Sequence, residues 1–222
     1  MTGSPDTATK PRNKRGSTRA RMLGSAVEVL RERGAAGVTI DEVLTRSGAP
    51  RGSVYHHFPG GRRQILIEAL EFAADTISGV IDAETLDNPG DLVHRFVEFW
   101  EQVLTGSDFT AGCPVVAAAL GSPDDEPELT AAASAIFDRW RTSLTGAFTA
   151  DGFTGSDAAS LAVMCLAALE GAVVLCRSSR SVQPLHDVAR QLEFLILSRE
   201  FVRRNGVPRI NRPAAPGPTG HK

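Results

Sequence analysis

Residues 39–58 carry the pattern that most constrains how this chain folds. Their sequence, TIDEVLTRSGAPRGSVYHHF, contains two short helical stretches separated by a tight turn. Thr39 is suited to cap the first helix, and Gly48 is free to adopt the left-handed backbone conformation that a tight interhelical turn requires. Pro50 suits the first turn of a second helix, where its missing N–H costs little. The pattern therefore predicts a helix-turn-helix.

The rest of the chain is also predicted to be helical. Apolar side chains recur at three- and four-residue spacing between residues 16 and 204, and glycine or proline breaks separate the stretches. Runs of β-branched residues, which are typical of strands, are few. We expect an all-α fold of about nine helices, with Ser17 or Thr18 capping the first and the last two spanning residues 155–177 and 184–204.

The two ends of the chain lack this periodicity. Residues 1–15 are predicted to form a disordered basic arm. Residues 205–222 contain four prolines and three glycines, a composition that predicts a flexible tail. Between the ends we expect a small helical head at residues 16–66 and a larger helical body at residues 67–204.

Charge distinguishes the head from the body, although the formal net charge is only −2. Residues 1–66 carry twelve Lys/Arg and five Asp/Glu, a balance of +7, whereas residues 67–222 carry twelve and twenty-one, a balance of −9. This asymmetry predicts a polyanionic partner such as DNA at the head only. The sequence has no glycine-rich phosphate loop, G-x-S-x-G or H-E-x-x-H motif, which argues against an enzyme.

The remaining composition predicts no metal site, no cofactor and no membrane partner. Cys113, Cys165 and Cys176 are an odd number without a C-x-x-C pair, so we expect buried thiols in a reducing compartment. The adjacent His56 and His57 would point about 100° apart on a helix, which does not suit a shared metal ion. No run approaches the roughly 20 apolar residues of a membrane span, so we expect a cytoplasmic protein.

The segment 16–66 resembles the DNA-binding domain of TetR-type transcriptional repressors. The resemblance rests on A-x-x-V-L-R-E-R-G at 26–34, G-V-T-I-D-E-V at 37–43 and S-G-A-P-R-G-S-V-Y-H-H-F at 47–58, followed by a Gly-Gly-Arg-Arg entry into a long helix. It implies that the second short helix enters the major groove of a double-stranded DNA operator. The positions that it places at the DNA are Thr39, Pro50, Arg51, Gly52, Ser53, Tyr55, His56, Gly61 and Arg62.

The resemblance implies different roles within this set. Arg51 is the candidate for reading a guanine edge, with a phosphate contact or a solvated side chain as its alternatives. Tyr55 and His56 are candidate phosphate or sugar contacts, with a partly buried packing side chain as the alternative for Tyr55. Gly61 would place the first N–H groups of the next helix against a phosphate, assisted by Arg62 or Arg63. Gly52 departs from the pattern because it places no side chain near the groove.

The body resembles the LmrA/YxaF-like subgroup of the same family at Gly112-Cys113-Pro114 and at Leu169-Glu170-Gly171-Ala172. The subgroup implies a small hydrophobic or aromatic effector, which needs an apolar cavity among the middle helices. Aromatic residues at helical spacing usually pack in a core, and Cys113 is either a redox-sensing thiol or a small buried residue. The candidate pocket residues are Phe96, Phe99, Trp100, Phe109, Cys113, Phe137 and Trp140.

The last two helices are apolar over an arc wider than internal packing requires. The family resemblance implies that they form a four-helix interface in a homodimer, and burial inside one subunit is the alternative. The candidate interface residues are Leu161, Cys165, Ala168, Leu169, Ala172, Val188, Leu192 and Leu195.

These features together predict a ligand-responsive repressor that binds a palindromic operator as a dimer and is released by its effector. A nonspecific architectural DNA-binding protein and, less favoured, an enzyme that transforms a small molecule are the alternatives.

Overall fold

Helices make up the architecture of the computed structural model, which describes residues 14–81, 89–121 and 126–206. No strand occurs in these three stretches, which confirms the all-α prediction. The elements are α1 (Lys14–Gly37), α2 (Ile40–Ser47), the 3-10 turn η1 (Arg51–Ser53), α3 (Val54–His57), α4 (Gly61–Ile81), α5 (Pro89–Gly106), α6 (Pro114–Gly121), α7 (Pro127–Ala150), α8 (Gly155–Ser179) and α9 (Gln183–Asn205).

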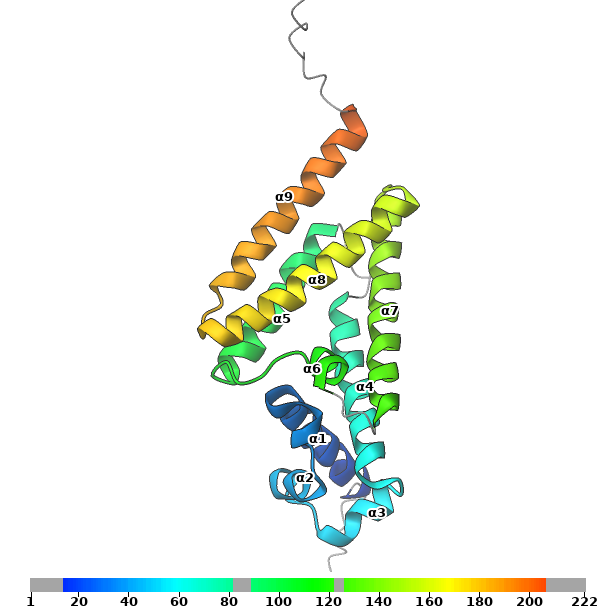
Figure 1. Ribbon diagram of the computed structural model, residues 1–222, viewed down its shortest axis with the longest axis vertical. Helices are drawn as coiled ribbons and strands as arrows, with labels where there is room; N and C mark the ends of the chain where they lie inside the picture. The colour runs from blue at the N-terminus through cyan, green and yellow to red at the C-terminus, as the bar shows by residue number, and fades with distance from the viewer. Residues whose placement is uncertain (1–13, 82–88, 122–125, 207–222) are drawn as a thin grey trace, which may run out of the picture.

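The head lies at one end of an elongated molecule and consists of α1, α2, η1, α3 and the beginning of α4 (Figure 1). Apolar side chains from each α-helix meet in its core. Met22 and Leu30 of α1, Val43 of α2, Val54 of α3 and the following Phe58 have no exposed surface. Because large apolar groups are packed this closely, α2 and α3 are held in a fixed relative orientation.

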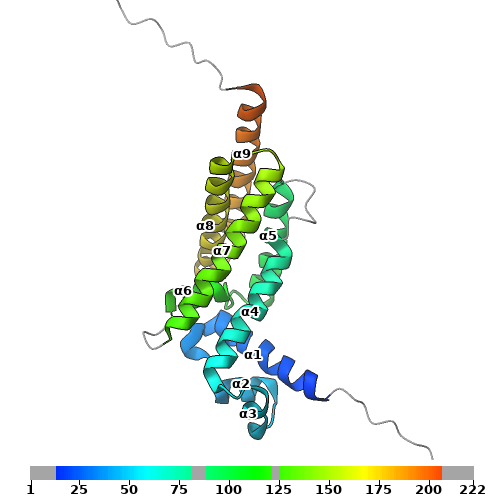
Figure 2. The same ribbon diagram turned by 90° about the vertical axis from the view of Figure 1, so that its right-hand side faces the viewer.

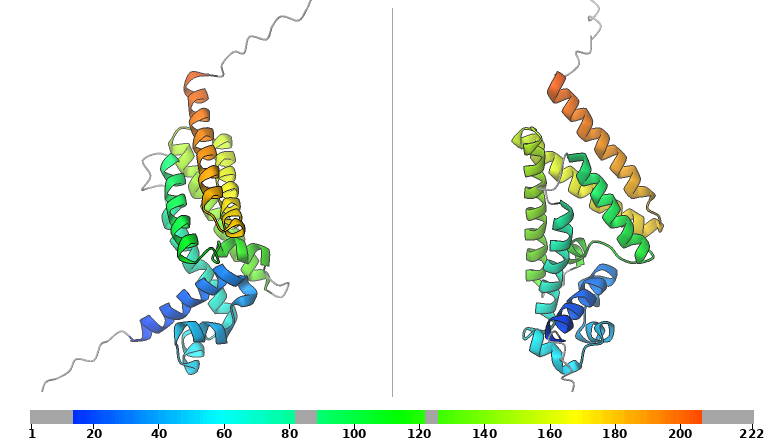
Figure 3. Two further views of the ribbon diagram at one scale, coloured as in Figure 1. Left: turned by 90° about the vertical axis from the view of Figure 1, so that its left-hand side faces the viewer. Right: turned by 180° about the vertical axis from the view of Figure 1, so that it is seen from behind.

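The body is a bundle of long helices, seen from two directions in Figures 1 and 2. α7 packs against α4, α6 and α8, whereas α9 packs against α5 and α8. Figure 3 shows α8 and α9 side by side at one face of the body. Trp100, Trp140 and Phe148 are among the largest fully buried side chains of this bundle.

Two helices connect the head to the body. α4 runs without interruption for 21 residues from the head into the bundle, where it contacts α5 and α7. α6 packs against α1 on one side and against α7 on the other. A displacement within the bundle therefore has two routes by which it can reach the head.

The first helix begins earlier than the sequence predicts. α1 begins at Lys14, so neither Ser17 nor Thr18 caps it, and the backbone of Gly34, with φ of 69°, kinks it near its end. Residues 1–13 of the expected arm and residues 207–222 of the expected tail lie outside the described residues.

The second helix of the helix-turn-helix also differs from the prediction. Pro50 precedes this helix in an extended conformation, with φ of −63° and ψ of 138°. The chain then forms the 3-10 turn η1, and α3 is a single turn of four residues. The recognition segment is therefore shorter and less regular than the expected helix from Pro50.

By length and composition alone, α8 is long and apolar enough to cross a membrane, which was not predicted from the sequence. An 18-residue window of this helix has a mean hydropathy of 2.2. In the fold, 44 % of that window is buried inside the protomer. A core helix of a soluble bundle passes the same test, so composition alone does not distinguish the two cases.

Candidate nucleic-acid interface and effector-binding body

The local geometry of the helix-turn-helix follows the sequence prediction. The hydroxyl of Thr39 accepts a hydrogen bond from the backbone N–H of Glu42 at 3.1 Å, which caps α2. Gly48 ends α2 with φ of 62°, the left-handed conformation that a side chain would strain. The predicted cap and the predicted turn are both confirmed.

A cluster of polar side chains projects from η1 and α3 at the tip of the head. The Arg51 side chain is 80 % exposed and pairs with Asp41 at 2.5 Å. Tyr55 is 64 % exposed, and His56 is exposed beside it. Because solvent screens an ion pair this exposed, Arg51 could leave Asp41 and bind a stronger anion at little cost in free energy. We call Arg51, Tyr55 and His56 the tip residues.

The other expected DNA-contacting residues near the tip have structural partners. Ser53 donates its hydroxyl hydrogen to the carbonyl of Pro50 at 2.6 Å, which holds the 3-10 turn. Gly61 is buried with φ of 62°, and its N–H donates to the carbonyl of Phe58 at 2.8 Å. Gly52 is exposed and, as expected, offers only its backbone.

Arg62 occupies a different place from the one expected. Its Nε donates to the carbonyl of Val38 at 2.7 Å and its Nη2 to the carbonyl of Ala35 at 2.8 Å, while Nη1 pairs with Glu126. These contacts tie the start of α4 to the end of α1 and to the start of α7. The guanidinium is therefore directed into the protein, whereas the next residue, Arg63, is 62 % exposed and pairs with Glu128.

Replacing Arg62 with alanine is expected to destabilise the protein by about 2 kcal/mol, because two hydrogen bonds to carbonyls and an ion pair are lost. The Arg63→Ala variant is the matched control, since its exposed pair should contribute about 0.5 kcal/mol or less. Urea denaturation followed by circular dichroism, at one protein concentration, would measure both. Equal losses in the two variants would contradict the role assigned to Arg62.

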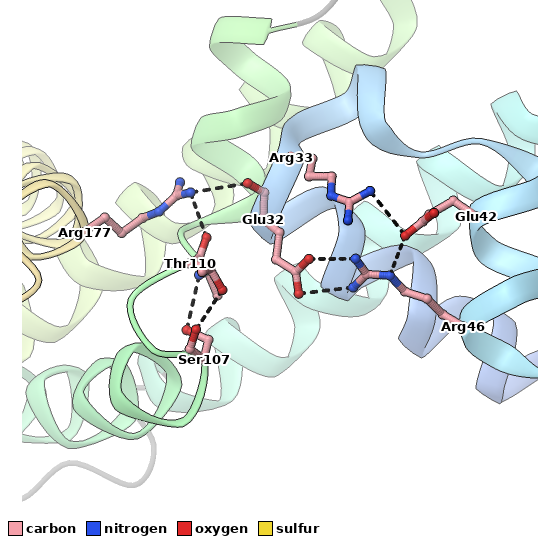
Figure 4. A network of polar contacts seen from close by, with 8 residues as sticks. Glu32, Arg33, Glu42, Arg46, Ser107, Thr110 and Arg177 are labelled. Carbon is pink, nitrogen blue, oxygen red and sulfur yellow. Dashed lines mark hydrogen bonds and ion pairs between the residues drawn. The ribbon is translucent and has the colours of Figure 1, made fainter.

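A second set of contacts links the head to α8 (Figure 4). Arg46 of α2 donates two hydrogen bonds to the carboxylate of Glu32 on α1, at 3.1 and 2.8 Å. These bonds lower the pKa of Glu32 and raise that of Arg46. Arg177 of α8 donates to the backbone carbonyls of Glu32 at 3.3 Å and Thr110 at 2.7 Å. α8 is therefore connected to α2 through a single residue of α1.

Gly112 lies close to the Arg177 side chain at this junction. A Cβ atom at this position would lie 2.9 Å from two atoms of the Arg177 side chain, closer than real Cβ contacts. The N–H of Gly112 also donates to the carbonyl of Arg31 at 3.0 Å. The glycine of the Gly112-Cys113-Pro114 motif thus makes room for the contact between α8 and α1.

Most of the expected pocket residues are packed in the core of the body. Phe96, Trp100, Cys113 and Trp140 are buried, and the indole N–H of Trp140 donates to the hydroxyl of Ser78 at 2.9 Å. The other three expected residues, Phe99, Phe109 and Phe137, are half-buried. Phe137 also lines a hollow of about 330 Å³ between α7 and α8.

Glu170 lies in the wall of the same hollow and was not anticipated as a site residue. It is only 7 % exposed, and neither of its carboxylate oxygens has a hydrogen-bond partner among the residues that the structure describes. Burial raises the pKa of Glu170 to about 7, and the adjacent thiol of Cys113 offsets part of this effect. An acidic residue within an otherwise apolar helix was the signal that could have identified it.

The residues expected at a subunit interface are largely internal. Leu161, Cys165, Leu169, Ala172 and Leu192 are buried within the protomer, and Ala168, Val188 and Leu195 are half-buried. Other apolar side chains of the same two helices are exposed: Val163, Met164, Val174 and Leu175 on α8, and Phe194, Leu197, Phe201 and Val202 on α9. We call these eight residues the α8–α9 face.

Comparison with known families accounts for both parts of the chain. Residues 23–69 match the bacterial regulatory proteins of the tetR family. Residues 89–191 match the C-terminal domain of transcriptional regulators described as LmrA/YxaF-like. The first match covers the helix-turn-helix and the second covers most of the body.

Individual relatives agree with the family matches. The HTH-type transcriptional regulator Rv0196 of Mycobacterium tuberculosis (strain ATCC 25618 / H37Rv) is 40 % identical over 81 % of this chain and 94 % of its own. The HTH-type transcriptional regulator LmrA of Bacillus subtilis (strain 168) is 27 % identical over 77 % of this chain and 92 % of its own. The crystal structure of regulatory protein TetR from Rhodobacter sphaeroides superposes with a TM-score of 0.69, at 24 % identity, over 79 % of this chain and 96 % of that one.

Proposed function

Because this chain belongs to the TetR family of bacterial transcriptional regulators, we propose that it is a repressor that binds a two-fold symmetric DNA operator as a homodimer. In this proposal an apolar effector bound in the body lowers operator affinity. Members of the family are regulators rather than enzymes, and we extend that to this chain, with the cytoplasm as its compartment.

The observation that carries the proposal is the cluster of tip residues. Arg51, Tyr55 and His56 are exposed on η1 and α3. Figure 1 shows α3 at the end of the head that is farthest from the body. A protruding helix of this size fits the major groove, and an arginine at its start is suited to a guanine edge. Arg62 is withdrawn from the proposed DNA contacts, and the exposed Arg63 takes its place as a candidate phosphate contact.

Homodimerisation is proposed through the α8–α9 face. The residues of this face come from two helices that pack against each other, and exposed apolar residues of this kind commonly mark a protein interface. Two copies joined by a two-fold axis would place their recognition segments about one helical turn of DNA apart, or roughly 34–36 Å.

Replacing Arg51 with alanine is expected to weaken operator binding about 5- to 100-fold and to relax discrimination at one base pair in each half-site. The operator can be obtained by selection from a random duplex library with the full-length protein, and binding can be measured by fluorescence anisotropy. Arg139→Ala removes an equally charged side chain from α7 and serves as the control.

The same measurement separates the proposal from its main alternative. A sequence-specific repressor should select a two-fold symmetric site and bind it far more tightly than random duplex DNA. Selection that yields no common sequence would favour a nonspecific architectural protein. Unchanged affinity and unchanged base preference in Arg51→Ala would contradict the assignment of the tip residues.

A further inference from the structure

We propose that Glu170 is the polar anchor of a binding site for a protonated amine carried on an apolar, aromatic body. The site is the hollow between α7 and α8. This inference deepens the proposed function, because it assigns a chemical class to the effector.

The first observation is the unsatisfied carboxylate. Glu170 is more than nine-tenths buried, and among the described residues neither oxygen accepts a hydrogen bond from an N–H or O–H donor. A buried carboxylate without donors is costly, and the adjacent Cys113 thiol is only a weak donor. The position is therefore unsuited to a purely structural role and suited to a ligand that brings donors of its own.

The second observation is the charge balance of the hollow. Asp138 and Arg141 of α7 line it together with Glu170, and Arg141 pairs with Asp138 at 2.9 Å. Arg141 thus forms its ion pair with Asp138 and not with Glu170, which has no ion pair among the described residues. An ammonium ion supplies a compensating charge and up to three hydrogen-bond donors, whereas a hydroxyl group supplies one donor and no charge.

The third observation is the apolar remainder of the wall. Phe137 and Leu166 line the same hollow, and Val163 of the α8–α9 face lies at its edge. The Phe137 ring packs edge-on against Trp140, with 5.6 Å between the ring centroids, so its position is fixed by the core. The preformed aromatic wall fits the ring of an aromatic amine, and the buried carboxylate fits its ammonium group.

The position of Glu170 along α8 connects the site to the head. Arg177 lies seven residues further on, about two helical turns, and holds the carbonyl of Glu32 on α1. A ligand that displaces α8 near Glu170 would therefore move the side chain that contacts the head. Ligand binding and DNA binding can be coupled in this way only if the ligand has different affinities for the two positions of α8.

The test compares naphthylmethylamine with naphthylmethanol, two compounds of similar shape that differ in charge. Isothermal titration calorimetry with the full-length protein is expected to show that the amine binds on the order of 10- to 100-fold more tightly than the alcohol. In Glu170→Gln this preference should fall to about threefold or less, while the affinity for the alcohol changes little. Asp75→Asn, which removes an exposed carboxylate of α4 outside the hollow, is the control and should keep the preference.

Three results would overturn the proposal. They are equal binding of amine and alcohol to the wild-type protein, a preference that survives in Glu170→Gln, and no binding of either compound at millimolar concentration. The regulatory role is tested separately by measuring operator affinity with saturating amine. A site that binds the amine without changing operator affinity would leave the present proposal standing and contradict the effector part of the proposed function.

The contact of Arg177 offers a further check on the coupling. Arg177→Ala should retain the amine preference but reduce the effect of the amine on DNA binding. Arg180→Ala is the matched control, because Arg180 pairs with Asp108 in the segment before α6 and has no recorded contact with α1. A larger loss of coupling in Arg180→Ala than in Arg177→Ala would refute the route through Glu32.

Discussion

Replacing both Phe194 and Leu197 with glutamate is expected to convert the proposed homodimer into folded monomers and to lower operator affinity at least about 100-fold. In the protomer these side chains are 67 % and 63 % exposed, so the substitutions leave the internal core intact. At a subunit interface, however, they would bury unpaired charges, which costs several kcal/mol for each group. A monomer also loses the gain in affinity that comes from engaging two half-sites at once.

Analytical ultracentrifugation would report the oligomeric state, and circular dichroism would show whether the helices remain. Phe72→Glu provides a matched control, because Phe72 is 53 % exposed on α4 and lies outside the α8–α9 face. The control should stay dimeric and bind the operator. A double variant that remains dimeric would show that the two copies meet elsewhere.

Replacing Glu170 with glutamine is expected to stabilise the ligand-free protein by about 3 kcal/mol at pH 8, because the amide removes a charge that is costly to bury. The pKa of Glu170 is about 7 in the folded protein, above its ordinary value of 4.5. Between these two values the unfolded chain releases the proton while the folded protein retains it. Wild-type stability should therefore fall as the pH rises from about 4.5 to 7 and lose nothing more from this group above that range.

Urea denaturation from pH 4.5 to 8, with wild type and Glu170→Gln side by side, would isolate this contribution. The groups that face Glu170 are Cys113, whose buried thiol has a raised pKa and stays protonated in this range, and the pair of Asp138 and Arg141. Asp75→Asn, on the exposed surface of α4 and outside the hollow, is the control and should follow the wild-type profile. Parallel profiles for wild type and Glu170→Gln would mean that the carboxylate is already compensated in the folded protein.

The sequence by itself determined the helical elements and the local geometry of the helix-turn-helix. A cap such as Thr39 and a left-handed turn such as Gly48 depend on backbone and side-chain groups within three residues of each other. Apolar periodicity likewise predicts where a helix lies, because a helix must cover an apolar stripe to be stable in water. These features are local, and the helices predicted at 155–177 and 184–204 occur as Gly155–Ser179 and Gln183–Asn205.

Only the tertiary structure decided which side of each helix faces the interior. In α8 and α9 the apolar arc is wide enough to serve both the bundle and a partner, so periodicity could not tell Leu192, which is buried, from Phe194, which is exposed. The same holds for polar residues: Arg62 and Arg63 are neighbours with the same chemistry. Arg62 meets carbonyl groups 24 and 27 residues away and a carboxylate 64 residues away.

Glu170 shows the same limit at the candidate ligand site. Its isolation depends on the packing of α7 against α8 and on the position of Cys113, because these neighbours surround the carboxylate without supplying an oxygen or nitrogen donor. The spacing of residues in a sequence does not reveal that a buried carboxylate will lack a hydrogen-bond donor. The chain's local pattern specified the helices and the turn of the head, and long-range packing specified which charged groups are structural and which are available to a ligand or to DNA.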